Sequence, residues 1–141
     1  MRNSISVLVL GLSVCCSGLA QLEVKKTVIS YSKSIPKETA EKFAAHLLDI
    51  EFLDGNPGKI QLIQKAKTIQ VRFIMHEEAF TSQDALEHYH VLRHGFASVV
   101  FDGEQVEIHF CDDNFVTKKV IKENIPLEFM LLEHFRREKQ I

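Results

Sequence analysis

A helix pattern that runs through an Asp-Gly turn into two alternating strands occurs twice in this sequence, and it constrains the fold more than any other feature. The two turns are Asp54-Gly55 and Asp102-Gly103. Any helix that enters a hairpin needs such a turn, so the turns alone do not establish a repeat. The apolar helix positions also match, 49 residues apart: Ala40, Phe43, Leu47 and Ile50 correspond to Tyr89, Leu92, Phe96 and Val99. We therefore predict a pseudo-symmetric αββ-αββ repeat over residues 35–76 and 82–122.

The complete periodicity predicts one α+β domain over residues 21–141, with the order β-α-β-β-α-β-β-α. Residues 22–29 read as a single edge strand, and residues 126–139 as a final helix. Because the strands alternate cleanly and form hairpins, we expect a single antiparallel sheet with helices packed on one face. The residues expected to face the core are Ile60, Leu62, Ile69, Val71, Phe73, Val106, Ile108 and Phe110. The opposite face would carry Gln61, Ile63, Gln70, Arg72, Glu107, His109 and Cys111.

The first twenty residues read as a secretory signal peptide. Arg2 gives a positive start, residues 5–14 are apolar, and Gly18 and Ala20 provide the small residues of a cleavage site after Ala20. A transmembrane helix needs about 20 apolar residues, so this run is too short to be one. Lipidation at Cys15 or Cys16 is an alternative. The sequence thus predicts a periplasmic or secreted protein. Beyond export, the lipid anchor is the one alternative by which it would associate with the membrane.

Composition narrows the classes of partner. The formal net charge is −2, so no basic surface for nucleic acid or anionic lipid is expected. Two of the three cysteines lie in the predicted signal peptide, which leaves Cys111 alone and excludes a disulfide within the mature chain. The mature part also lacks a glycosylation sequon, which favours a bacterial source. A lone exported cysteine could join two chains, so a homo-oligomer is one possible assembly.

The stretch EHYHVLRH, residues 87–94, is the candidate metal site. On an ideal helix Glu87, His90 and His94 share the face opposite the core stripe. Two histidines four residues apart can bind zinc, copper or nickel, with Glu87 one turn earlier as a third ligand. A solvated polar face explains the same residues equally simply. His88 lies at the edge of the core stripe and is expected to be packed.

The stretch EIHFC places Glu107, His109 and Cys111 on one face of a strand. A thiolate nucleophile needs its base within hydrogen-bond reach, and neighbours two apart on a strand are nearly 7 Å apart at the backbone. Direct activation of Cys111 by His109 therefore needs a bend in the strand, and a hydrolase that uses these two residues ranks behind the two functional hypotheses given below. The sequence contains no phosphate-binding glycine loop, serine elbow or paired zinc cysteines, so an enzyme is the weaker class.

The final predicted helix is apolar around more of its circumference than one core contact requires, at Phe129, Met130, Leu131, Leu132 and Phe135. It either closes the core or offers a surface to another chain. Our first functional hypothesis is a small exported non-enzymatic domain that binds a protein or other ligand through an open sheet face or this helix. The second is a periplasmic transition-metal-binding protein that uses His90 and His94.

Overall fold

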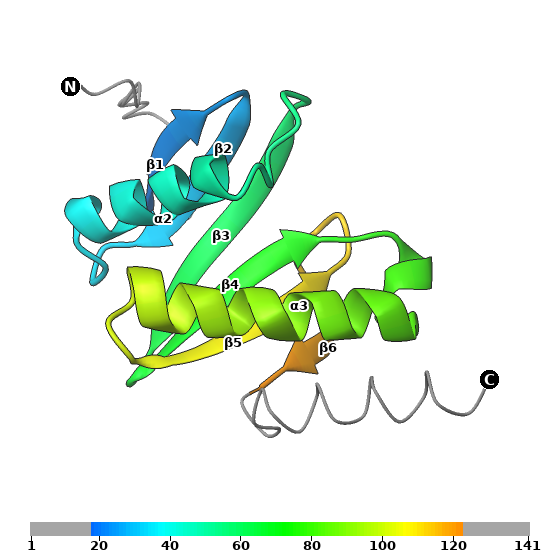
Figure 1. Cartoon of the computed structure of the whole chain (residues 1–141). Coiled ribbons are helices and arrows are strands. Elements are labelled where there is room, and N and C mark those ends of the chain that lie inside the picture. The colour runs from blue at the N-terminus through cyan, green and yellow to red at the C-terminus, as the bar shows by residue number, and fades with distance from the viewer. Residues whose placement is uncertain (1–17, 123–141) are drawn as a thin grey trace.

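The computed structural model describes residues 18–122, which form one six-stranded sheet and two main helices (Figure 1). The strands are β1 (Leu19–Val24), β2 (Thr27–Ser32), β3 (Gly58–Lys65), β4 (Thr68–Ile74), β5 (Gln105–Cys111) and β6 (Thr117–Ile121). The helices are α2 (Lys37–Asp49) and α3 (Gln83–Gly95), with short helical turns η1 (Glu77–Phe80) before α3 and η2 (Phe96–Val100) after it. The strands lie in the sheet in the same order as in the chain.

The sheet is mixed, so the predicted single antiparallel sheet is wrong. The hairpins β1–β2, β3–β4 and β5–β6 are antiparallel, but β2 pairs with β3 in parallel, and so does β4 with β5. Each parallel pair is joined through a helix, α2 or α3. A helix that crosses the sheet returns the chain to the end where the previous strand began, and parallel pairing needs such a connection. Alternation along each strand shows its buried side but does not show the direction of its neighbour.

The predicted element order is also wrong at its beginning, because the expected single strand over residues 22–29 is the hairpin β1–β2. Its turn is formed by Lys25 and Lys26, with φ angles of 48° and 69°. Two-residue hairpin turns with positive φ normally contain Gly, Asn or Asp. Two lysines carry no such signal, so the sequence reads as one continuous strand. The described order is therefore β-β-α-β-β-α-β-β, with α3 flanked by its two short helical turns.

The core lies between one face of the sheet, here called the inner face, and the two helices that cover it (Figure 1). All the strand residues predicted to face the core are buried, which confirms that part of the pattern. Aromatic rings join the layers: Phe73 and Phe110 of the sheet contact Tyr89 of α3, with ring centroids 5.5 and 4.9 Å apart. Phe43 of α2 meets Phe96 edge to face at 5.1 Å. The aromatic contacts thus connect α3 to strands β4 and β5, and connect α2 to the turn η2 that follows α3.

Both predicted helix stripes are correct except at their last position. In α2, Ile50 is 40% exposed because the helix ends at Asp49 and Glu51 then turns the chain with a φ of 57°. After α3, Val99 is 50% exposed and Val100 is buried instead. Here the chain forms a π-turn, in which the Phe101 amide donates to the Phe96 carbonyl at 3.0 Å. A π-turn holds more residues than an α-turn, so the core position moves by one residue.

Parts of the sequence-based interpretation lie outside the described residues. The predicted C-terminal helix, residues 126–139, and most of the predicted signal peptide belong to these parts. Strand β1 begins at Leu19, two positions before the predicted cleavage product would start, and Leu19 and Ala20 pair with Ser32 and Tyr31 of β2. The predicted internal repeat remains a prediction, although the described chain does place a helix and two strands in succession twice.

Candidate functional site: the polar face of the sheet

The face of the sheet that α2 and α3 leave uncovered, here called the outer face, carries a row of hydrogen-bonding side chains. Ser30, Gln61, Arg72 and His109 are successive partners across β2, β3, β4 and β5. A second row, one step along the strands, contains Gln70 beside Glu107. Residues at paired positions of neighbouring strands project from the same face, so these side chains line one face of the sheet. Gln70 and His109 are buried there, and the other four are partly exposed.

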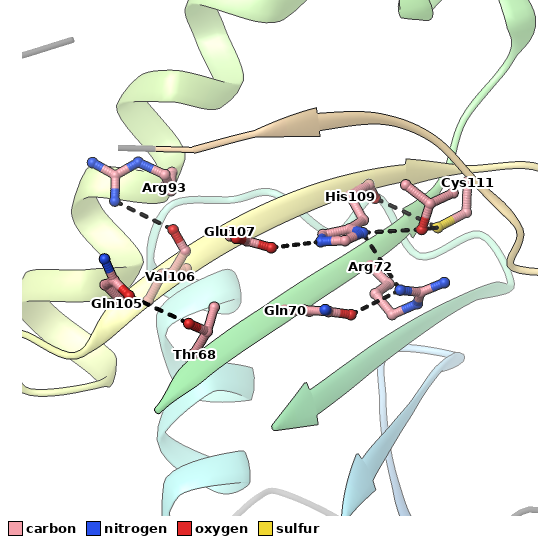
Figure 2. A network of polar contacts seen from close by, with 10 residues as sticks. Thr68, Gln70, Arg72, Arg93, Gln105, Val106, Glu107, His109 and Cys111 are labelled. Carbon is pink, nitrogen blue, oxygen red and sulfur yellow. Dashed lines mark hydrogen bonds and ion pairs between the residues drawn. The ribbon is translucent and has the colours of Figure 1, made fainter. Parts of the chain in front are cut away.

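His109 lies at the centre of a polar network on this face (Figure 2). Its Nε2 lies 2.9 Å from a carboxylate oxygen of Glu107, and its Nδ1 lies 2.9 Å from the Thr117 hydroxyl. The same Nδ1 is 3.4 Å from Nη1 of Arg72. Burial lowers the pKa of His109 and Arg72 adds to this effect, while the Glu107 carboxylate opposes it. The imidazole is therefore neutral at pH 7.

Arg72 connects this network to the turn between β5 and β6. Its Nη2 donates to the Phe115 carbonyl at 2.6 Å, and its Nη1 donates to the Gln70 side-chain oxygen at 2.9 Å. Phe115 has a φ of 61°, a left-handed conformation that non-glycine residues rarely adopt. The Asp112 carboxylate stabilises the same turn by accepting the amides of Asn114 and Val116, which lowers the pKa of that carboxyl.

The network places the predicted Cys111–His109 pair in one cluster without a bond between thiol and imidazole. The Cys111 sulfur lies 3.7 Å from the His109 carbonyl oxygen and 4.0 Å from the Thr117 hydroxyl. Its thiol is fully buried, and burial raises the pKa of Cys111. Nucleophilic cysteines have a lowered pKa and an accessible sulfur. The geometry therefore does not favour the hydrolase hypothesis.

Sequence reasoning placed Gln70, Arg72, Glu107 and His109 on this face but missed Thr117. The β5–β6 register shifts between Phe110 and Cys111, so Thr117 rather than Lys118 pairs with Cys111. A bulge of this kind has no reliable sequence signal, because it depends on how two strands meet. The shift brings the Thr117 hydroxyl to the His109 imidazole.

The histidines of α3 lie away from this network. His94 is exposed, His90 is half-buried, and Gln83 donates to Glu87 at 3.3 Å. Burial lowers the pKa of His90, as does nearby Arg93, which keeps the imidazole in the neutral form that metals need. Among residues 18–122 no three His, Cys, Asp or Glu side chains are arranged to hold a metal ion. The site at Glu87, His90 and His94 stays a prediction.

A cavity of about 730 Å³ lies at one end of the sheet. Its apolar walls come from Val28, Phe52, Leu53, Ile60 and Ile74, and its charged rim contains Lys26, Lys59, Asp54 and Asp113. The Asp54 carboxylate accepts two hydrogen bonds from Asn56, which lower the pKa of that carboxyl and engage it within its own turn. The rim charges balance, so the cavity does not select a charged ligand.

None of the described helices is long and apolar enough to cross a membrane. Comparisons of the chain with models of known protein families, with curated proteins and with solved structures found no match.

Proposed function

We propose that this protein is a small exported non-enzymatic domain that binds a protein partner through the outer face of its sheet. The observation that carries the proposal is the position of both main helices on the inner face (Figure 1). Within residues 18–122 no helix lies over the polar rows of β2 to β5, where Gln61, Arg72 and Glu107 are partly exposed. A sheet that packs helices on one face alone can use the other for recognition. Export rests on the signal peptide predicted from the sequence.

The chemistry of the outer face favours a polar protein surface as the partner. Gln61 and Ser30 offer an amide and a hydroxyl, each of which both donates and accepts hydrogen bonds. Arg72 and Glu107 add one charge of each sign. The hydrogen bonds of the network hold Arg72 in place, so less side-chain entropy is lost when a partner binds. A mixed array of donors and acceptors suits a protein surface better than an apolar or uniformly charged ligand.

A capture experiment with matched substitutions tests this proposal. Tagged full-length protein is compared with Gln61→Arg on the outer face and with Val91→Arg, whose side chain is 52% exposed on α3. We expect a partner that remains with the wild type and with Val91→Arg but is lost with Gln61→Arg. Circular dichroism shows whether both variants keep the fold. A partner that is lost with Val91→Arg and kept with Gln61→Arg would contradict the proposal.

The same variants identify a second copy of the chain as the partner. Light scattering of the wild type would then give a dimer, and Gln61→Arg would give a monomer. A monomer in every case, together with a captured partner, would assign the outer face to a different protein.

A further inference from the structure

The neighbours of His109 determine which ring nitrogen carries the proton in the neutral form. Nε2 faces the Glu107 carboxylate at 2.9 Å, and an ionised carboxylate only accepts hydrogen bonds. Nδ1 faces Arg72 Nη1 at 3.4 Å, and a guanidinium only donates. The proton therefore lies on Nε2, and Nδ1 accepts from Arg72 and from the Thr117 hydroxyl. The neutral ring has partners on both nitrogens.

Protonation of His109 disturbs one of these contacts more than the others. The new hydrogen on Nδ1 can be accepted by Thr117 after its hydroxyl rotates, and Glu107 gains an opposite charge beside it. Arg72 can make no such adjustment, because its N–H group then meets another N–H group and its positive charge meets a second one. Among residues 18–122, the charged groups that act on the ring are Glu107 on β5, Arg72 on β4 and Lys65 at the end of β3. Of these, Arg72 lies within hydrogen-bond distance and opposes the charged ring.

Arg72 transmits this disturbance to the β5–β6 turn. The same guanidinium that approaches His109 through Nη1 binds the Phe115 carbonyl through Nη2 at 2.6 Å. This bond ties the turn to β4. Because Phe115 holds a left-handed backbone conformation, the turn depends on the hydrogen bonds that stabilise it.

We propose that His109 is a proton-sensitive joint: its protonation displaces Arg72 from the Phe115 carbonyl and loosens the β5–β6 turn. The consequence extends to the end of the sheet, because Asp112, Asp113 and Lys118 of this region line a second cavity of about 500 Å³ together with His76 and Glu77. Acidification thus changes the outer face and the shape of this cavity together. This response to protonation needs no ligand, so it can be tested independently of the proposed binding function.

The test uses uniformly ¹⁵N-labelled full-length protein studied by NMR between pH 8 and pH 5. The ring nitrogens of His109 should show the Nε2-protonated tautomer at the upper end of this range. The Phe115 amide donates to the Asp112 carbonyl at 2.9 Å and is therefore protected from exchange. Below the His109 transition we expect its exchange, corrected for the intrinsic pH effect, to become roughly tenfold faster, as for loss of one charge-assisted bond. The Asp112 carboxylate, whose pKa is lowered, stays ionised over this range.

Three variants separate the joint from a merely structural role. His109→Gln should abolish the pH dependence of the Phe115 amide, and His94→Gln, at an exposed position, should leave it unchanged. Glu107→Gln removes the carboxylate that favours the protonated ring, so the transition should move to lower pH. A neutral Nδ1-protonated tautomer, or a Phe115 amide that does not follow the His109 titration, would overturn the proposal. If His109→Gln does not fold, the wild-type tautomer and the Glu107→Gln shift decide the matter.

Discussion

The π-turn after α3 is best tested by truncating two neighbouring valines separately. Val100 is 2% exposed and Val99 is 50% exposed, although the helical periodicity of the sequence assigns the core position to Val99. The same substitution, valine to alanine, at each of the two positions therefore shows which valine lies in the core.

The magnitude follows from burial. Val100→Ala removes two buried methyl groups, at about 0.8 kcal/mol of transfer free energy each. The cavity left between α2, η2 and the sheet adds about 1 kcal/mol, so we expect the free energy of unfolding to fall by about 2–3 kcal/mol. Val99→Ala removes groups that are already half in water. Alanine also has the higher helix propensity, by about 0.5 kcal/mol, so the net change should be close to zero.

Urea unfolding of both variants, followed by circular dichroism, gives the two differences directly. The dependence of the free energy on urea should remain the same in both, since neither substitution alters the overall surface buried on folding. A larger loss for Val99→Ala than for Val100→Ala would refute the π-turn register and restore the continuous α-helical phase.

The remaining predictions concern the turns, the network and the histidines. Replacing Lys25-Lys26 by Asn-Gly should stabilise the protein by about 1 kcal/mol in urea unfolding, because both positions have positive φ; a loss of stability would exclude this turn type. Because burial lowers the pKa of His109 below its unfolded value near 6.5, its contribution to stability is complete above pH 6.5 and lost as pH falls through the folded pKa. Acidification to pH 5 should therefore destabilise the wild type more than His109→Gln, and equal slopes of stability against pH would contradict this. Cys111, which is fully buried, should react with a thiol reagent only at the rate of unfolding in urea; rapid labelling of the native protein would contradict its burial. The metal site at Glu87, His90 and His94 predicts that the wild type binds one zinc, copper or nickel ion in calorimetric titrations and that the His90→Ala, His94→Ala double variant does not. No binding by the wild type, or binding that survives both substitutions, would exclude this pair as ligands.

The alternation of polar and apolar residues predicted part of the candidate site but not its contacts between strands. The alternation of QVEIHF and TIQVRFI is enough to place Arg72, Glu107 and His109 on the face opposite the core, because side chains on a strand alternate with a period of two. The same alternation leaves open which strand lies beside which. The contact between Arg72 and His109 depends on the parallel pairing of β4 with β5, and the Thr117 contact depends on the bulge in β6.

By itself, the sequence determined helices α2 and α3, the hairpins β3–β4 and β5–β6, and the buried side of β3, β4 and β5, since these follow from periodicities within a few residues. The tertiary structure decided the parallel pairings, the π-turn that exchanges Val99 for Val100, and the left-handed turns at Lys25-Lys26 and Phe115. Each of these reflects a compromise between a local preference and packing against a distant segment. Such a compromise leaves no mark in the residues nearby, because its energy comes from contacts made elsewhere in the chain.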